Sequence, residues 1–411
     1  MTATSDVLVF SKRSTGGVRI LAGMLREEGM RPVLVSADPD DMNRDSCDAH
    51  VVVDWDRAGL PELVAAVDAA GVVPAAVVNL VEPLIGWQIR TARHYGLPGG
   101  EPGREVLTSK ALVRGEMRRL GLSALPFAAG PAGSFPVGSV TEFPVIVKPS
   151  LDSGASRLVR LAHGPGDLSR HLGDIAAKTT PELEVVVERY IEGTEFSIDG
   201  PVLDGRFRAL FCVEKTQHDE RRHHDAGLRI SPPPSAHVRR GVEETVEDIS
   251  ALCTALDLAG GWLHVEGRVP PDGRSELVEI NPRPGGGLHR TATLRTCGVD
   301  PVRAIVQAAL GGEQAKGLAD TARNTELLAL LPFEVDRIGQ VTGATPIEEI
   351  KAIPGVVDGY QFDRFEVLTL DQENFFTEAL ITAETVAGLG EVADRVRAAF
   401  RYEMAEETHD R

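Results

Sequence analysis

The sequence predicts a parallel α/β unit followed by antiparallel α+β units in one chain. Over residues 6–100, short apolar runs alternate with amphipathic stretches, the pattern of a doubly wound parallel sheet. From residue 143 onward, strand-like runs are joined by turns such as Asp204-Gly205 and Asp272-Gly273, and Asp-Gly is a strong hairpin signal. At 411 residues the chain is too long for one ordinary core, so we expect two to four domains.

The first unit contains four apolar runs that we predict to be parallel strands: Val7–Phe10, Val33–Val35, Val51–Val53 and Ala75–Val78. Val18–Glu28 is amphipathic and is closed by Gly29, as a helix would be. Ser14-Thr15-Gly16-Gly17 follows the first run and suits either anion binding at a helix start or a simple glycine turn. It lacks the G-x-G-x-x-G spacing, which argues against a nicotinamide dinucleotide.

The remaining predicted elements follow the same reasoning. They are a helix at 105–120, a linker rich in Gly, Pro and Ala at 126–138, strands at 145–148 and 185–191, and a C-terminal α+β unit from about 325 with a strand-like stretch at 356–370 and a helix at 386–400.

Composition excludes several functional classes. The net charge of −18 argues against a general nucleic-acid binder, because such proteins neutralise phosphates with Lys and Arg. The four cysteines lie far apart, as expected of reduced, buried thiols. We see no secretion pattern and no apolar run of the roughly 18–20 residues that cross a bilayer. We therefore expect a cytoplasmic protein that binds no membrane.

The most informative motif is the hairpin centred on Asp272-Gly273. Counting outward from this turn places Glu266 opposite Glu279 and His264 opposite Asn281, with all four side chains on one face. Opposed carboxylates repel one another, so such a pair suggests a shared proton or a cation. Two carboxylates and an amide oxygen suit Mg²⁺ that also holds phosphates. The alternative is an amphipathic hairpin with a solvated acidic face.

Three further motifs are individually weaker. Lys148 ends an apolar strand and precedes a loop of small residues, Ser150–Arg157, which suits a polyphosphate but also an ordinary hairpin tip. Residues 185–197 form a strand and a glycine turn that could hold a flat base, with Glu195 beyond it for a ribose, or an ordinary β-hinge. Arg283, followed by Gly285–Gly287, suits a phosphoryl oxygen and a reacting carbonyl, or a flexible turn.

The order of these motifs, from about Lys110 to Gly287, resembles that of the ATP-grasp superfamily. The run Asn281-Pro282-Arg283-Pro284-Gly285-Gly286 and the C-terminal unit are most similar to the L-amino acid ligase, or dipeptide synthase, group. The resemblance implies an ATP-grasp fold in five parts: a β-α domain at 1–104, a linker helix and connection at 105–141, a small lid subdomain at 142–191, a catalytic antiparallel-sheet subdomain at 192–320 and an α+β domain at 321–411.

The resemblance also implies ATP and two Mg²⁺ ions as cofactors, and roles for particular residues. Those implied to bind the nucleotide are Lys110 and Lys148 at the phosphates, Ser153, Gly154, Ala155 and Ser156 in the loop over them, Glu188, Tyr190 and Ile191 at the adenine and Glu195 at the ribose. Those implied to hold metal are Glu266, Glu279 and Asn281. Those implied in catalysis are Arg283 at the transferring phosphoryl group, Gly286 through its backbone amide and Asp225 as an orienter or base.

Two positions depart from the family pattern. Asp225 occupies the acidic position of the substrate loop, but Leu228 replaces the histidine expected three residues later. His218, His223 and His224 lie nearby, as substitutes, metal ligands or solvated residues. Leu288 stands where a polar residue is expected. These departures bear on the amine substrate rather than on phosphoryl transfer.

The activity implied is an ATP-dependent carboxylate–amine ligation through an acyl phosphate, releasing ADP and phosphate. The resemblance implies small carboxylate and amine substrates, amino acids or amino-acid-like molecules among them, and it suggests a homodimer. The alternatives are an ATP-dependent carboxylase or purine-pathway-type ligase on the same fold, and a catalytically silent nucleotide-binding protein.

Overall fold

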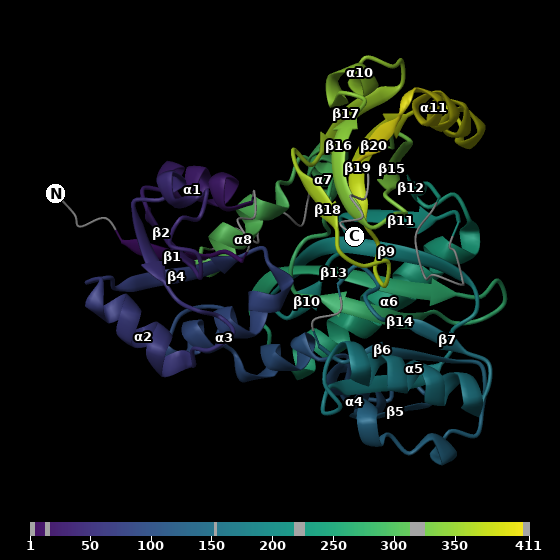
Figure 1. Ribbon diagram of the computed structural model, residues 1–411, viewed down its shortest axis with the longest axis horizontal. Helices are drawn as coiled ribbons and strands as arrows, with labels where there is room; N and C mark the ends of the chain where they lie inside the picture. Colours follow the sequence, from purple (N-terminus) through teal and green to yellow (C-terminus); the bar gives the residue numbers. More distant parts are fainter. Residues whose placement is uncertain (1–4, 13–16, 152–153, 218–226, 313–324, 406–411) are drawn as a thin grey trace, which may run out of the picture.

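The computed structural model describes residues 5–12, 17–151, 154–217, 227–312 and 325–405. It begins with the predicted parallel sheet, which has the strand order β3-β2-β1-β4 (Figure 1). Its strands are β1 (Asp6–Phe10), β2 (Arg31–Ser36), β3 (Ala49–Val52) and β4 (Pro74–Asn79). The core on one face contains side chains of α1 (Gly17–Glu27) and α8 (Pro301–Ala309), and that on the other contains side chains of α2 (Leu60–Ala69) and α3 (Ile85–His94).

The second unit is a small antiparallel sheet with the order β5-β8-β6-β7, which we call the lid. Its elements are β5 (Phe127–Pro131), β6 (Val145–Pro149), β7 (Arg160–Ala162), β8 (Glu184–Arg189) and the covering helix α5 (Pro165–Lys178). The prediction of a linker at 126–138 was wrong in part, because β5 pairs with β8 along its whole length. Gly and Pro in β5 hid the strand, which lies at the sheet edge where Pro is tolerated.

The central sheet is antiparallel and contains nine strands. Their order is β14-β13-β9-β11-β12-β15-β19-β17, with β10 paired to β9. The bounds are β9 (Thr194–Leu203), β10 (Arg206–Phe207), β11 (Phe211–Lys215), β12 (Arg229–Ser231), β13 (Gly260–Val269), β14 (Glu276–Asn281), β15 (Leu328–Glu334), β17 (Val356–Gln361) and β19 (Phe375–Thr382). Helix α6 (Ala236–Ala255) packs its apolar side into the core beneath β9 and β13.

The C-terminal unit shares the central sheet instead of forming a sheet apart from it. Strands β15, β19 and β17 continue from β12, while β16 (Gly339–Ala344), β18 (Phe365–Val367) and β20 (Tyr402–Met404) form a separate small sheet. Helices α10 (Ile347–Lys351) and α11 (Val386–Ala399) complete the unit, and α11 packs against β15 and β19. The stretch 356–370 therefore contains two strands in different sheets, where a single strand-like stretch was expected.

The helix predicted at 105–120 is interrupted at one residue. A 3-10 helix (Pro102–Thr108) is followed by extended Ser109 and then α4 (Lys110–Arg119). The Ser109 hydroxyl caps α4 by accepting a hydrogen bond from the Leu112 amide at 3.2 Å. This cap separates the two helices and places Lys110 in the first turn of α4. Within the described part of the chain, no helix combines the length and apolarity needed to span a bilayer.

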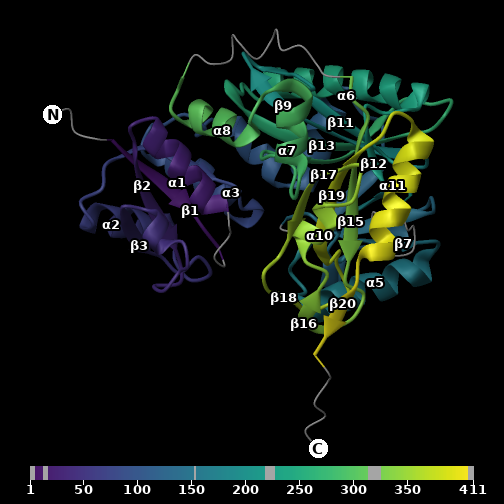
Figure 2. The same cartoon turned by 90° about the horizontal axis from the view of Figure 1, so that it is seen from above.

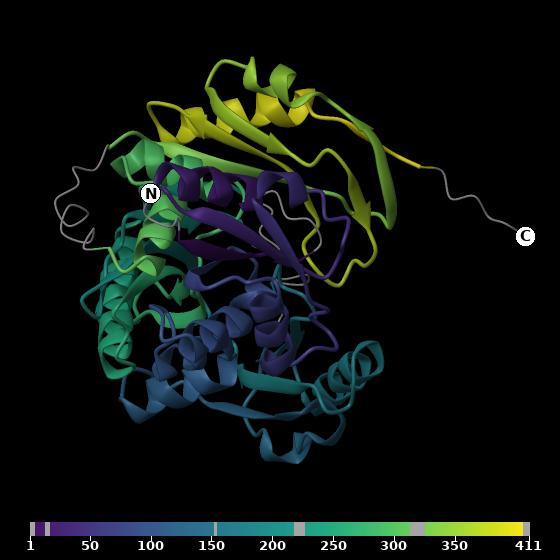
Figure 3. The same cartoon turned by 90° about the vertical axis from the view of Figure 1, so that its left-hand side faces the viewer.

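These units surround the central sheet. The lid lies at the bottom of Figures 1 and 3 and the C-terminal unit at the top, with the central sheet between them. Figure 2, seen from above, shows the N-terminal unit beside the central sheet, where α8 joins its α1. Residues from all these units therefore reach the faces of β13 and β14 that the sequence singled out.

Candidate active site

The carboxylate hairpin has the predicted register. In the pairing of β13 with β14, Glu266 lies opposite Glu279 and His264 opposite Asn281. The register shifts by one residue beyond Glu266, so the bulge falls between the predicted metal residues and the turn. Glu266, Glu279 and Asn281 line one cavity of about 480 Å³.

Each carboxylate of this pair has a cation beside it. The Lys110 Nζ lies 2.8 Å from a Glu279 oxygen, and the Lys215 Nζ lies 3.2 Å from a Glu266 oxygen. Burial opposes ionisation of Glu266, but Lys215 and His264 hold its pKa well below the ordinary value. Ionised oxygens therefore face the cavity, which is the state that metal coordination requires.

Lys148 lies near the end of β6 in a buried cluster of charges. Its Nζ is 2.7 Å from a Glu188 oxygen and donates a hydrogen bond to the Val278 carbonyl at 3.0 Å. Arg114 donates two hydrogen bonds to the same carboxylate, at 2.6 and 3.0 Å. Burial opposes the ionisation of Glu188, but Arg114 and Lys148 lower its pKa to about 2. Two cations share one carboxylate, so the cluster carries a net positive charge suited to a phosphate.

Most of the predicted nucleotide residues surround a narrow cavity of about 80 Å³ between the lid and the central sheet. Its lining includes Lys110, Lys148, Ser156, Glu188, Tyr190, Ile191 and Glu195, together with Glu266 and Glu279. Gly154 and Ala155 line the adjoining larger cavity. Ser153 lies outside the described residues, as does Asp225. The structure thus brings together a set of residues that span more than 150 positions of sequence.

Glu195 and Glu188 have more partners than the sequence indicated. Glu195 lies 2.5 Å from the Lys215 Nζ and accepts a hydrogen bond from Arg268 at 2.8 Å. Arg268 also donates to the Tyr190 hydroxyl at 2.8 Å. Ribose binding by Glu195 and adenine binding by Glu188 stay predictions, whereas the observed contacts show both carboxylates orienting cations.

Glu82 is a residue that the sequence did not single out. It begins a short 3-10 helix (Glu82–Leu84) after β4 and forms an ion pair with Arg283. Both side chains line the larger cavity, although one belongs to the N-terminal unit. The Arg283 Nε is buried and has no hydrogen-bond partner within the described residues. Arg283 therefore presents an unused donor at the place where an anionic group is expected.

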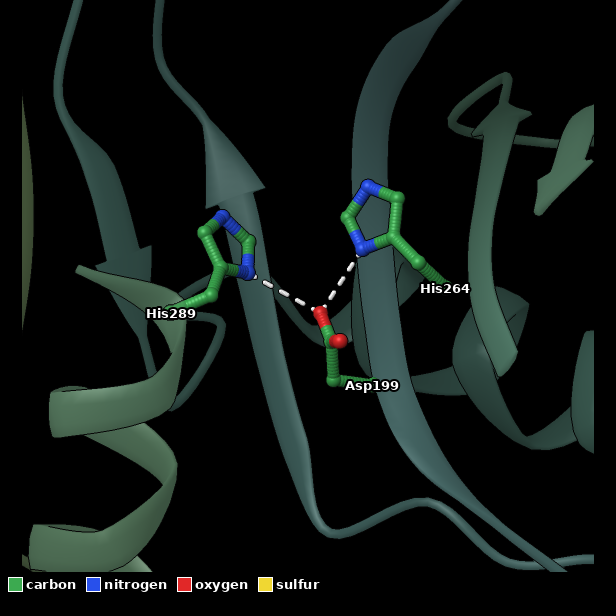
Figure 4. Close-up of side chains that lie close together, drawn as sticks. All are labelled: Asp199, His264 and His289. Carbon is green, nitrogen blue, oxygen red and sulfur yellow. Dashed lines mark hydrogen bonds and ion pairs between the residues drawn. The ribbon is translucent and has the colours of Figure 1, made fainter. Parts of the chain in front are cut away.

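A second network joins the hairpin to the glycine turn. Figure 4 shows the Nδ1 atoms of His264 and His289 meeting the same Asp199 oxygen, at 2.7 and 2.9 Å. The other Asp199 oxygen accepts hydrogen bonds from the Trp262 indole at 3.1 Å and the Gly285 amide at 2.8 Å. Burial lowers the pKa of His264, but Asp199 and Glu266 outweigh it and raise that pKa to about 9. Because Asp199 accepts hydrogen bonds from β13, from the glycine turn and from His289 at once, we interpret this group as a structural network that ties these segments together.

The glycine turn is held from the other side by the C-terminal unit. The Leu288 amide donates a hydrogen bond to a Glu378 oxygen at 2.6 Å, and Arg229 lies 3.4 Å from the other oxygen. Gly286 lines the cavity with its backbone. Leu288 thus contributes its amide where a polar side chain was expected. Leu228, at the expected histidine position, is buried in the core of the C-terminal unit.

Comparison with known proteins identifies the class of domain. A family model described as an ATP-grasp domain matches residues 141–292, which include three of the four lid strands (β6, β7 and β8), the hairpin and the glycine turn. Residues 141–292 are therefore an ATP-grasp domain, and the chain as a whole has the ATP-grasp fold.

Solved structures extend the likeness to the full chain. The L-amino acid ligase from Bacillus licheniformis superposes with a TM-score of 0.82 at 16% identity, covering 99% of this chain and all of that one. Phosphoribosylglycinamide synthetase from Anaerococcus prevotii gives 0.70 at 13% identity, with 98% and 100% coverage. The biotin carboxylase domain of Hydrogenobacter thermophilus 2-oxoglutarate carboxylase, solved with MgADP and bicarbonate, gives 0.69 at 17% identity, with 98% and 91% coverage. At these identities the likeness concerns the fold alone.

Two curated proteins match only a segment of this chain. The chain is 35% identical over 119 residues to mRNA cap guanine-N(7) methyltransferases of Neosartorya fischeri and Aspergillus fumigatus. The match covers 27% of this chain and 17% of those proteins, so the chain spans only a small part of their length. Such a match carries no functional assignment.

Proposed function

We propose that this protein is an ATP-dependent carboxylate–amine ligase that joins amino acids or amino-acid-like substrates. The observation that carries this proposal is the convergence on continuous cavities of an opposed carboxylate pair, a net-positive phosphate cluster and Arg283 with an unused buried donor. The lysines and Arg283, with a divalent cation held by the carboxylates, would neutralise a polyphosphate and an acyl phosphate together.

The donor groups on the hairpin fit a hard divalent cation. Glu266, Glu279 and Asn281 would hold Mg²⁺, which neutralises phosphate charge when it is bound. Lys110 and Lys148 reach the narrow cavity from α4 and β6, where they would hold the phosphates. Binding of the nucleotide would draw Lys110 partly away from Glu279, freeing that carboxylate for the metal.

The proposed reaction has two steps. A substrate carboxylate oxygen attacks the γ-phosphorus of ATP, and the bond between that phosphorus and the bridging oxygen breaks to release ADP. The amine nitrogen then attacks the acyl carbon, loses a proton to solvent or phosphate, and inorganic phosphate leaves. Arg283 would hold the phosphoryl oxygens in the first step. Arg283 and the amides of the glycine turn, Gly286 among them, would stabilise the oxyanion in the second.

An ADP-release screen tests the proposal. The full chain with ATP and Mg²⁺ is supplied with amino acids singly and in pairs, and products are identified by mass spectrometry. Release of ADP that depends on an amino acid, with a product of the mass of an amide, supports the ligase. Release that depends on bicarbonate indicates a carboxylase instead. Nucleotide binding with no turnover in either arm indicates a silent nucleotide-binding protein.

A further inference from the structure

The larger cavity continues beyond the carboxylate pair to a wall of aromatic rings supplied by the C-terminal unit. This aromatic wall consists of Tyr360, Phe362, Phe365, Phe375 and Phe376. It lies in the part of the chain that follows the matched ATP-grasp domain, and the motifs in the sequence gave no sign of it.

The rings form one continuous series from core to cavity. Phe376 is buried in the core of the C-terminal unit, and its ring centroid lies 5.5 Å from that of Phe365. Phe365 stacks on Phe362 at 5.3 Å, and Phe362 meets Tyr360 edge-on at 5.1 Å. Tyr360 and Phe362 are 40% and 41% exposed. The inner rings thus hold the outer pair in place, while the outer rings keep open apolar surface.

The aromatic wall belongs to the candidate active site because it lines the same cavity. The cavity that the rings line also contains Glu266, Asn281 and Arg283, which the proposed function places at the reacting groups. Arg229 also lines this cavity, with its guanidinium 4.9 Å from the Phe375 ring centre and 3.4 Å from a Glu378 oxygen. A molecule with a charged reacting end and an apolar other end would match both regions of the cavity.

We propose that one substrate is an amino acid with an aromatic or large apolar side chain, and that this side chain packs against Tyr360, Phe362 and Phe365. The inference rests on the proposed ligase function and specifies its substrate class. Exposed aromatic rings that border a cavity mark a binding site, because burying them against a ligand removes apolar surface from water.

The test compares phenylalanine, leucine, alanine and aspartate as substrates of the full chain. We expect kcat/KM for phenylalanine or leucine to exceed that for alanine by about 10- to 100-fold, the range expected for burying a large side chain. Phe362→Ala should reduce this preference about tenfold, mainly by raising KM for the larger substrate. Leu368→Ala is the matched control: Leu368 lies on the same segment, is 69% exposed and is not part of the cavity lining. It should leave the preference unchanged.

Two further measurements keep the outcome decisive. Phe362→Leu retains apolar volume, so if Phe362→Ala fails to fold, a shift from aromatic toward aliphatic substrates in Phe362→Leu supports the proposal. If no substrate is turned over, the ligase proposal fails. Calorimetry of amino-acid binding, with Mg²⁺ and a non-hydrolysable ATP analogue present, then tests separately whether the aromatic wall binds large apolar side chains. A preference for alanine or aspartate overturns the inference. The inference is also overturned if the parent chain is a dimer, Phe362→Ala is a monomer, and the substrate preference is unchanged. That result would show that the rings contact a second copy of this chain instead of a substrate.

Discussion

At the scale of single residues, Glu188 shows how the site stores positive charge. Its carboxylate is 3% exposed and is shared by Arg114 and Lys148, so one negative charge holds two cations in place without fully neutralising them. Removing a buried carboxylate of this kind leaves its cations unpaired, which is costly. In the proposed function, Glu188 would act on the phosphates through the lysine that it orients.

The depressed pKa of Glu188 predicts a particular acid sensitivity. Its pKa is about 2 in the folded chain and 4.5 ordinarily, so its stabilisation is complete above 4.5 and is lost as the pH falls toward 2. We expect Glu188→Gln to lower the free energy of unfolding most near neutral pH, and the difference from the parent to shrink below pH 4.5. Urea titrations of both proteins at several pH values measure this difference in unfolding free energy. A difference that does not change with pH would contradict this account.

The metal assignment predicts a loss of turnover without loss of structure. Glu279→Gln removes one charge of the opposed pair, so we expect kcat to fall at least about 100-fold while the chain stays folded, as the circular dichroism spectrum would show. Asp272→Asn, in the turn of the same hairpin and exposed, is the control and should keep activity. Steady-state ADP release measures both variants. Normal turnover by Glu279→Gln would refute the magnesium assignment.

At the scale of elements, the turn between β14 and α7 (His289–Cys297) is shaped by what packs against it. Asp199 on β9 accepts a hydrogen bond from Gly285, and Glu378 on β19 accepts one from Leu288. Gly287 adopts φ = +57°, which favours glycine. A Cβ there would lie 2.2 Å from a Glu378 oxygen. Two strands of the central sheet thus hold the turn at Gly285 and at Leu288, on either side of the Gly286 amide that the proposed oxyanion requires.

Neighbouring glycines provide a matched pair of variants. In Gly287→Ala, the added Cβ would strain the backbone at a positive φ and would clash with Glu378. We therefore expect the unfolding free energy to fall by about 1–3 kcal/mol and kcat to fall as well. Gly286→Ala meets no atom within 4 Å, so its stability should stay close to the parent's. Chemical denaturation measures the stability of the two variants, and steady-state ADP release measures their kcat. Equal stability of the two variants would show that the turn is not held as described.

At the scale of the whole molecule, the C-terminal unit contacts the lid as well as the central sheet. Asp371, between β18 and β19, pairs with Arg160 and lies 2.5 Å from the Lys178 Nζ, both on the lid. The Glu373 amide donates to the Ala155 carbonyl at 2.8 Å, in the predicted phosphate loop. The segment that leads into the aromatic wall therefore also docks the lid.

This docking predicts coupling between the lid and product formation. Asp371→Asn weakens both ion pairs, so we expect the lid to open more often and the acyl phosphate to meet water. The ratio of phosphate released to amide formed should rise. Asp167→Asn is the control, because Asp167 pairs with Arg170 within the lid alone. An unchanged ratio in Asp371→Asn would show that this contact does not seal the site.

The sequence predicted what depends on local pattern. The register of Glu266 with Glu279 follows from alternation and an Asp-Gly turn, and it was found as expected. Contacts between segments far apart in the chain could not be predicted from the sequence. Asp199 and Lys215 reach the site because β13, β9 and β11 are consecutive strands of the central sheet, and Glu82 reaches it from the N-terminal unit. A lone acidic or basic residue in the sequence gives no sign of such contacts. The joining of β15 to β12 likewise depends on pairing across a long stretch of chain.

The central claim is that one magnesium-nucleotide site lies between the lid and the carboxylate hairpin. A crystal structure of the full chain with MgADP tests it most directly. The account predicts phosphates beside Lys110 and Lys148 and a metal ion within bonding distance of Glu266, Glu279 and Asn281. Nucleotide bound elsewhere, or a metal ion that contacts none of these three residues, would contradict it.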